Sequence, residues 1–346
     1  MKLKDATHAY TFDDLVLSPV QSDIESRGDP DISVPNAPIY SIPIVSSPMS
    51  TITEVAMAET MRKQGGGSAI HRYMPIEEQA KMAGFFYGSD GPMPFAAIGS
   101  NGDAMERASA LYEAGCRKFL VDVANGHNIH CVRTVQALRE RWSHIDIMAG
   151  NVVTSYGTEV LIGAGANFIR IGVGSGAACT TRLVTGHGLP QLSAVEECAQ
   201  VKPNHPDVVL ISDGGIRGSG DIVKSLAAGA DMIMIGSLLA ATSETPGDII
   251  EEEGKLYKYY SGMASDDARS KWFDKSKEGI PPEGISIKVP YSGKSAAKII
   301  KNLSDSVKVG LSYSGAKNIL ELREKASWRL VTGAGFAEGL PHGKNR

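Results

Sequence analysis

Short apolar runs alternate with amphipathic stretches through the first two thirds of the chain. Eight runs, rich in Val, Ile, Met and Phe, end in small or polar residues; they are IPIVSS, GGSAIH, PFAAIG, KFLVDV, IDIMAGN, NFIRIG, VVLISDGG and MIMIG, within residues 42–236. Between them, apolar residues recur at intervals of three and four, as a helix packed on one side requires. The pattern therefore predicts eight β-strands separated by helices.

The predicted strands are apolar along almost their whole length, which indicates a parallel sheet covered on both faces. Eight such units fit a closed (β/α)8 barrel, the TIM-barrel fold of the α/β class, as a single domain over residues 1–346 with no inserted regulatory domain. A doubly wound open sheet is the alternative. Its G-x-G-x-x-G fingerprint is missing after the first strand, and the similar GVGSGA follows the sixth strand and leads into no clear helix.

The character of the sequence changes after Leu239. Residues 254–292 are charged, aromatic and rich in glycine, a composition that predicts a hairpin followed by a long mobile excursion, which we call the flap. The last residues, from Gly333 onward, are predicted to be poorly ordered or tied to a neighbouring subunit.

Composition excludes several functional classes. The net charge is -4 and the isoelectric point is about 6.1, without the basic stripe of a nucleic-acid-binding protein. No apolar run reaches the roughly 18 residues that span a bilayer, and the N-terminus lacks the apolar core of a signal peptide, so we expect a cytoplasmic protein with no membrane partner. The four cysteines form no CxxC pair and are expected to be reduced thiols.

In such a barrel, chemistry gathers on the loops that follow the strands. The loop GVGSGAACTTR, residues 172–182, follows the sixth strand and places small residues ahead of Cys179. A thiol on this loop is exposed enough to react and can be activated by backbone amides and polar neighbours. A buried, inert thiol is the alternative, and it fits Cys116, Cys131 and Cys198 better. We therefore predict that Cys179 is a nucleophile.

Two further loops predict a nucleotide site. SDGG and IGS end the last two strands, where glycine amides commonly converge on a phosphate, and Asp213 beside them would accept hydrogen bonds from ribose hydroxyls. In the flap, Met263 offers an apolar wall for a flat base, and Glu283 lies between turn-forming residues. His71 and His127 are candidate bases, although a histidine at this position is as often structural.

Taken together, these motifs closely resemble the family of IMP dehydrogenase and GMP reductase, over almost the whole chain. The resemblance rests on GVGSGAACTTR, TGHGLPQLSAV, SDGG, IGS and SGMAS. DVANG at residues 122–126, IMAGNVVT from Ile147 and PQLSAV from Pro190 are similar to the reductase branch. The pair of nucleotide-sensing modules that most dehydrogenases insert is absent, and the flap segment ARSKWFDKSKEG lacks the Arg-Tyr pair with which dehydrogenases activate water.

The resemblance implies a GMP reductase, which converts GMP and NADPH to IMP, ammonia and NADP through a bond between Cys179 and the purine 2-carbon. Thr181 and Glu283 would handle protons so that the amino group leaves as ammonia. The implied substrate-binding residues are Asp213, Gly214, Gly215, Gly236, Ser237, Tyr260, Gly262, Met263 and Gly284, of which Asp213 binds the ribose, Gly215, Gly236, Ser237 and Tyr260 the phosphate, and Met263 with Gly284 the base.

The same resemblance implies a cofactor, a cation and an assembly. The cofactor-binding residues would be Asp122, Ala124, Asn125, Gly172 and Ser312. Backbone carbonyls of Gly174, Gly176 and Cys179 would ring a potassium ion. Family members form tetramers in which the adenosine end of the cofactor often touches a neighbour, so we expect a homotetramer.

Several positions depart from the reductase pattern. Ala177 and Ala264 replace serines, Ile280 replaces an arginine, and both the flap segment GIPPEG and the first barrel loop, in which Ser50 replaces an aspartate, lean toward the dehydrogenase. Two alternatives therefore stay open: an IMP dehydrogenase without the sensing modules, and an inactive nucleotide-binding protein that regulates a partner. The retained Cys179, Thr181 and Glu283 speak against the inactive protein.

Overall fold

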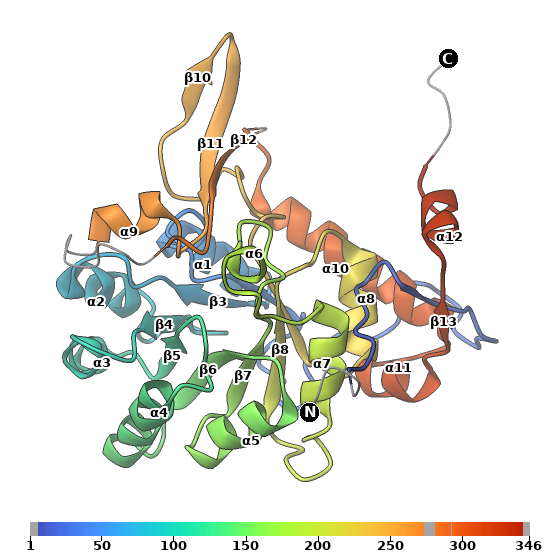
Figure 1. Ribbon diagram of the computed structural model, residues 1–346, viewed down its shortest axis with the longest axis horizontal. Helices are drawn as coiled ribbons and strands as arrows, with labels where there is room; N and C mark the ends of the chain where they lie inside the picture. Colours follow the sequence, from blue (N-terminus) through green and yellow to red (C-terminus); the bar gives the residue numbers. More distant parts are fainter. Residues whose placement is uncertain (1–5, 273–280, 292, 342–346) are drawn as a thin grey trace.

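Eight parallel strands close into a barrel in the computed structural model, which describes residues 6–272, 281–291 and 293–341 (Figure 1). Each strand pairs with the next along the chain, and the last pairs with the first. The strands are β2 (Ile44–Ser46), β3 (Gly67–Ile70), β4 (Phe95–Ile98), β5 (Lys118–Asp122), β6 (Asp146–Val152), β7 (Phe168–Ile171), β8 (Val209–Asp213) and β9 (Met232–Ile235). All eight coincide with the predicted apolar runs, so the TIM-barrel prediction is confirmed.

A ring of helices surrounds the barrel (Figure 1). Seven of them occupy the predicted periodic stretches: α1 (Val55–Lys63), α2 (Ile76–Gly84), α3 (Ala104–Glu113), α4 (Ile129–Arg141), α5 (Ser155–Gly163), α7 (Gln191–Ala199) and α8 (Ser219–Ala227). Helix α10 (Ala296–Tyr313), which packs against α8 and α1, was not among the predicted elements, and α11 (Ile319–Lys325) follows it. The buried Ile300, Val307 and Leu311 of α10 share one helical face, so the sequence did carry its signal.

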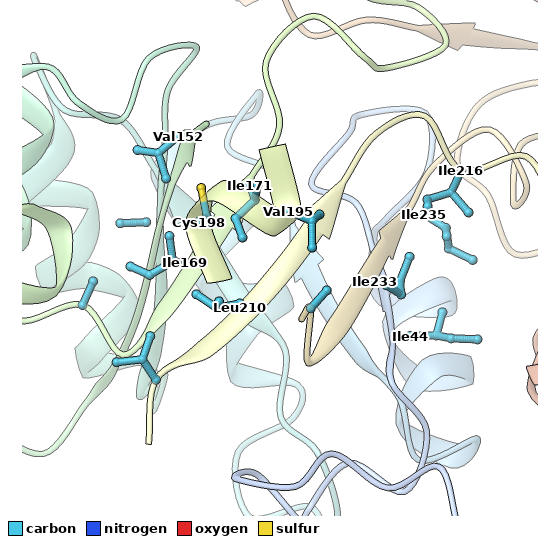
Figure 2. Close-up of a cluster of buried hydrophobic side chains, with 14 of the residues drawn as sticks. Ile44, Val152, Ile169, Ile171, Val195, Cys198, Leu210, Ile216, Ile233 and Ile235 are labelled. Carbon is cyan, nitrogen blue, oxygen red and sulfur yellow. The ribbon is translucent and has the colours of Figure 1, made fainter. Parts of the chain in front are cut away.

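Side chains alternate between the two faces of each barrel strand. On β7, Ile169 and Ile171 point outward and lie with Val195 and Cys198 of α7 in one buried cluster (Figure 2). Each such fully buried aliphatic side chain stabilises the fold by about 1.5–3 kcal/mol. The alternate residues point inward, where Phe168 joins a second buried cluster inside the barrel. Residue 170 of the same strand therefore also faces the barrel interior.

Packed side chains close the end of the barrel at which the strands begin. The ammonium of Lys118 is 2.7 Å from an Asp146 carboxylate oxygen and 3.2 Å from the Tyr40 hydroxyl. The rings of Phe95 and Phe168 lie with their centroids 5.3 and 5.7 Å from the same nitrogen. This end is a structural plug, which leaves the opposite end for a binding site.

A three-stranded antiparallel sheet rises above the open end of the barrel (Figure 1). It consists of β10 (Ile250–Glu252), β11 (Lys255–Ser261) and β12 (Ser286–Pro290), with α9 (Asp266–Trp272) between the last two strands. The predicted hairpin is thus present and gains a third strand. Residues 273–280 of the flap, including Ile280, lie outside the described residues.

The two ends of the chain meet beside the barrel. Strand β1 (Leu15–Leu17) pairs antiparallel with β13 (Trp328–Leu330), and α12 (Gly333–Glu338) follows. Of the two alternatives predicted for the tail, poor order does not hold for residues 333–338, because the Thr332 hydroxyl accepts a hydrogen bond from the Gly335 amide and caps a short helix; contact with a neighbouring subunit stays a prediction. Among the described helices, none is long and apolar enough to cross a membrane.

Candidate active site

A cavity of about 490 Å³ lies at the carboxyl ends of the barrel strands and is lined in part by the flap. It brings together most of the predicted site residues, namely Asp122, Ala124, Gly172, Gly174, Gly176, Cys179, Thr181, Asp213, Gly214, Gly215, Gly236, Ser237, Tyr260, Gly262, Met263 and Glu283. Residues far apart in the sequence thus share one chamber, as loops that follow the strands of such a barrel should.

Cys179 is the half-buried cysteine of the chain. Its sulfur is 3.1 Å from the Thr181 hydroxyl oxygen, and both residues line the cavity just before and within the short helix α6 (Thr181–Thr185). The other thiols are buried, as predicted, and burial raises the pKa of Cys116 to about 11 and the pKa values of Cys131 and Cys198 to about 12. Cys179 alone combines access to the cavity with a hydrogen-bonded hydroxyl.

The base of the flap holds the cysteine loop in place through backbone hydrogen bonds. The amide of Thr180 donates to the Glu283 carbonyl at 2.9 Å, and the amide of Ile285 donates to the Ala178 carbonyl at 2.9 Å. A Cβ on Gly284 would lie 3.1 Å from that carbonyl, so glycine permits the close approach. Gly284 therefore does not line the cavity; it lets Glu283 reach the cavity beside Cys179.

The two predicted phosphate loops line the same cavity, and the loop at Gly214 lies against the cysteine loop, since a Cβ on Gly214 would be 3.1 Å from the Gly176 amide nitrogen. Gly214 and Gly215 adopt positive φ angles of 106° and 75°, which only glycine accepts readily. A Cβ on Gly236 would lie 2.9 Å from the Ser47 hydroxyl and 3.1 Å from the Tyr260 hydroxyl, so these two hydroxyls flank its backbone. Burial, together with the charges of Asp213 and Cys179, raises the pKa of Tyr260 to about 12. Tyr260 is therefore a neutral hydroxyl that can donate to an anion at physiological pH.

A buried arginine joins two carboxylates in the cavity. Arg170 donates to Asp122 at 2.5 Å and to Asp213 at 2.7 Å, and the side-chain amide of Asn151 also donates to Asp213, at 2.8 Å. Burial opposes the charge on Arg170, but Asp213 and Asp122 outweigh it and raise the pKa of the guanidinium. Sequence reasoning missed Arg170 and Asn151. A charged residue inside the otherwise apolar run NFIRIG was the available signal, since a buried charge needs partners.

Gln191 is another residue that sequence reasoning missed, and it fixes the position of the cysteine loop. Its side-chain amide donates to the Ile171 carbonyl at 2.8 Å and to the Ser212 hydroxyl at 3.0 Å, and its oxygen accepts from the Ser175 hydroxyl at 2.7 Å. One buried side chain thus ties the ends of β7 and β8 to the loop that carries the thiol.

This geometry agrees with the comparison with protein families: a model described as the IMP dehydrogenase / GMP reductase domain matches residues 9–342. The chain belongs to this family. The inosine-5'-monophosphate dehydrogenase of Aquifex aeolicus is 44% identical over 253 residues, which cover 71% of this chain and 51% of that protein. That of Nitrosopumilus maritimus is 31% identical over 469 aligned residues, covering 96% of this chain and 98% of the relative. The chain spans about half the length of several curated relatives that it matches.

A solved structure of the family superposes over nearly the whole molecule. It is the crystal structure of a cysteine-to-alanine variant of GMP reductase from Trypanosoma brucei in complex with guanosine 5'-monophosphate. The TM-score is 0.91 at 27% sequence identity, and the match covers 99% of both chains. The likeness in fold is therefore complete, while the curated relatives named above are dehydrogenases.

Two residues from other loops fix the position of Met263, the flap residue that the family resemblance implies contacts the purine base. The Tyr73 hydroxyl donates to the Met263 carbonyl at 2.8 Å, and the Ser50 amide lies 3.4 Å from the Met263 sulfur. Met263 is thus held between the loop after β2 and the loop after β3. Arg72 and Tyr73 both line the cavity, and neither was among the predicted site residues.

The two histidines proposed as bases lie outside the cavity lining. His71 is buried, where its ring accepts from the Tyr73 amide and faces Glu54 at 3.2 Å. His127 contacts the ring of Tyr156 edge-on, with centroids 5.1 Å apart. The prediction of a catalytic histidine at either position is not supported by this geometry.

Two predicted cofactor-binding residues of the family also lie outside the lining. Asn125 is exposed and its side-chain oxygen accepts from the His127 amide at 3.1 Å, just beyond Ala124. Ser312 is buried in α10, where its hydroxyl donates to the Val309 carbonyl at 2.7 Å. Since α10 packs on the outside of the barrel, Ser312 does not reach the cavity of its own chain. Its neighbours Tyr313 and Ser314 line a second cavity, of about 480 Å³.

Proposed function

We propose that this protein is a GMP reductase, with the reaction GMP + NADPH + 2H⁺ → IMP + NH₄⁺ + NADP⁺. The observation that carries the proposal is the grouping of Cys179, Thr181 and Glu283 in one cavity with a nucleotide-sized set of polar groups. The GMP complex of the similar Trypanosoma brucei enzyme supports GMP as the ligand. The dehydrogenase branch has the same nucleophile. The two functions therefore differ in the step that releases the purine from the cysteine, which is hydride transfer in the reductase and hydrolysis in the dehydrogenase.

Substrate binding follows from the placement of the polar groups. Asp213 accepts hydrogen bonds from the ribose hydroxyls, because one of its oxygens is held by Arg170 and Asn151 while the other faces the cavity without a partner in the described part of the chain. The amides of Gly215 and Gly236, with Ser237 and the neutral Tyr260 hydroxyl, bind the phosphate. Met263 and the Gly262 backbone, which both line the cavity, enclose the purine ring, and Gly284 contributes by letting Glu283 reach the cavity.

The chemistry begins at Cys179. Its sulfur forms a bond to the purine 2-carbon, and the thiol proton passes through Thr181 or Glu283 to the departing amino group. Ammonia leaves with the electron pair of the broken carbon–nitrogen bond, so the 2-carbon stays bound to sulfur. When bound, NADPH supplies the hydride that replaces the amino group at the 2-carbon. The carbon–sulfur bond then breaks, IMP leaves, and the thiolate regains its proton.

Three sequence features favour the reductase exit over hydrolysis. The three motifs DVANG, IMAGNVVT and PQLSAV resemble the reductase pattern, and in addition the flap sequence contains no Arg-Tyr pair to activate water. Without an activated water, delivery of hydride is the faster way to release the purine. The departures at Ala177 and Ala264 remove two hydroxyls from the ligand set and leave Cys179 and Thr181 untouched.

The cofactor and the cation belong to the same proposal. Asp122, Ala124 and Gly172 line the cavity beside the purine subsite, and Asn125 lies at its rim. In a homotetramer, the adenosine end of NADPH would reach a neighbouring subunit, which gives Ser312 and the second cavity a role. The backbone carbonyls of Gly174, Gly176 and Cys179 would hold a potassium ion; of these three, only the Gly176 carbonyl accepts a backbone hydrogen bond among the described residues.

IMP dehydrogenase is the second candidate, and one observation favours it specifically. Arg72 and Tyr73 line the cavity with the guanidinium carbon 5.2 Å from the tyrosine ring centroid. An arginine–tyrosine pair in the cavity could activate water in place of the missing flap pair. The IMP dehydrogenase relatives and the flap segment GIPPEG point the same way.

Two assays with the purified chain separate these functions. With GMP and NADPH, we expect GMP-dependent loss of NADPH absorbance, with one ammonia and one IMP formed per NADPH consumed. Turnover only with IMP and NAD⁺ would assign the chain to the dehydrogenase branch. Saturable GMP binding without turnover in either direction would identify the inactive regulatory protein.

A further inference from the structure

Arg170 lies between the two halves of the candidate site. One terminal nitrogen of its guanidinium donates to Asp122, at the end of β5, and the other donates to Asp213, at the end of β8. Under the proposed function, Asp122 belongs to the cofactor half and Asp213 to the nucleotide half. A single side chain therefore spans both.

The burial of this group makes the connection stiff. The Arg170 side chain is 8% exposed, and the carboxylates of Asp122 and Asp213 are 16% and 17% exposed. At such burial, hydrogen bonds between charged groups are shorter and stronger than neutral ones, and a rotation of one partner leaves the other with an unsatisfied charge. The three side chains thus have few independent positions.

Each carboxylate keeps one oxygen for a ligand. Asp122 uses Oδ1 for Arg170, and Asp213 uses Oδ2 for both Arg170 and Asn151. Within the described residues, the second oxygen of each group accepts no hydrogen bond, and both residues line the cavity. A ribose hydroxyl that binds Asp213 would therefore fix Arg170 and, through it, the free oxygen of Asp122.

We propose that Arg170 is a positioning residue that couples the two ligand sites, so that a bound nucleotide prepares Asp122 for the dinucleotide and the dinucleotide prepares Asp213 for the nucleotide. The physical basis is that the three side chains can move only together, so the orientation that the first ligand selects is the one that the second ligand meets. Such coupling is reciprocal, because each ligand must change the affinity of the other by the same factor. This inference deepens the proposed function and rests on it for the identity of the ligands.

Arginine is needed for this role because its planar fork places two donors at a fixed separation. Lysine keeps the positive charge but presents one compact ammonium, which can approach only one of the two carboxylates closely. Arg170→Lys therefore keeps the positive charge and removes the simultaneous contact with both carboxylates. Arg107→Lys is a matched control, since Arg107 is also buried and pairs with Asp103, but it lies outside the cavity lining.

The test measures binding without turnover, in full-length protein that carries Cys179→Ala. Isothermal titration gives the Kd of NADP⁺ with and without saturating GMP, and the Kd of GMP with and without NADP⁺. We expect each ligand to tighten the other by about fivefold or more in the parent, a typical coupling. We expect a factor close to one in Arg170→Lys and an unchanged factor in Arg107→Lys. A merely structural role would lower both single-ligand affinities and leave their coupling intact.

A second variant covers the case in which Arg170→Lys does not fold. Asp122→Asn lies in the cofactor half and keeps the pair of Arg170 with Asp213, so it should also bring the coupling factor close to one. Coupling that persists in Arg170→Lys or in Asp122→Asn overturns the inference, as does its absence from the parent. Repeating the titrations with IMP and NAD⁺ separates the two proposals. Coupling through Arg170 with that pair alone would support this inference and reject the reductase.

Discussion

Each end of the barrel contains a basic side chain paired with at least one carboxylate, but the surroundings of the two groups differ. Strand β5 begins with Lys118 at the closed end and finishes with Asp122 at the open end. Below, Lys118 pairs with Asp146 and the Tyr40 hydroxyl, and aromatic rings fill the space around them. Above, the buried Arg170 pairs with two carboxylates that line an open chamber.

The difference between the ends lies in what remains unsatisfied. At the closed end, both carboxylate oxygens of Asp146 accept hydrogen bonds, one from Lys118 and one from the side-chain amide of Asn167. At the open end, each carboxylate keeps one oxygen without a partner among the described residues, and glycines such as Gly172 and Gly214 occupy positions where a Cβ would clash with neighbouring protein atoms. A buried ion pair is weak evidence for stability by itself. Its surroundings decide whether it closes the fold or holds a ligand.

The largest effect is expected at the open end, from Cys179→Ala. The substitution removes the proposed nucleophile, so kcat should fall by at least about 10³-fold, which is about 4 kcal/mol of transition-state stabilisation. Steady-state assays measure this loss. The control is Cys198→Ala, which deletes a buried thiol between α7 and the barrel: it should lower stability by about 1 kcal/mol and leave kcat unchanged. Equal losses of kcat in both variants would contradict the assignment.

Asp213→Asn should have the next largest effect. The amide cannot accept from the ribose and from Arg170 as the carboxylate does, so KM for the nucleotide should rise about 10- to 100-fold, or about 2 kcal/mol. Asp146→Asn is the matched change at the closed end and should leave KM as it is. An equal rise in KM in both variants would contradict the assignment of the nucleotide site to the open end.

Lys118→Met tests the closed end, where we expect a change in stability rather than in KM. The substitution leaves the carboxylate of Asp146 without its charged partner, so we expect the free energy of unfolding to fall by about 2 kcal/mol. The loss is smaller than for a fully buried pair because Asp146 is about one third exposed. KM should stay unchanged. Burial works against the Lys118 ammonium, but Tyr40 and Asp146 outweigh it and raise the pKa of Lys118 above 10.5.

A group whose pKa is raised on folding stabilises the protein below its unfolded pKa and loses that contribution as the pH rises through the folded pKa. The stability difference between wild type and Lys118→Met should therefore be constant up to about pH 10 and shrink above it. Denaturant unfolding at a series of pH values measures this difference. A difference that grows with pH would contradict the sign.

Tyr260→Phe should have the smallest effect at the open end. It removes one neutral donor to the phosphate, so KM for the nucleotide should rise about fivefold, near 1 kcal/mol, with kcat almost unchanged. Since burial raises the pKa of Tyr260 to about 12, its contribution should not vary with pH between 6 and about 10. Tyr259→Phe, on the exposed face of the same strand, is the control and should leave KM unchanged.

The barrel and the thiol were predictable because each leaves a local signal. Eight apolar runs with helical stretches between them define the fold, and glycines around Cys179 mark a loop with unusual backbone geometry. Helix α10 has a regular apolar face, yet it follows a long charged stretch that obscures the eighth unit. Arg170, Asn151 and Gln191 act through partners 16 or more residues away, and a single sequence does not display such pairs. Ser312 requires a neighbouring subunit to have the role assigned to it.

The most direct test of the central claim is intact-protein mass spectrometry of the chain mixed with GMP while NADPH is withheld. The account predicts one covalent adduct per chain with the mass of GMP less ammonia, absent from Cys179→Ala and discharged as IMP when NADPH is added. Absence of any adduct, together with an undiminished reaction rate in Cys179→Ala, would contradict it.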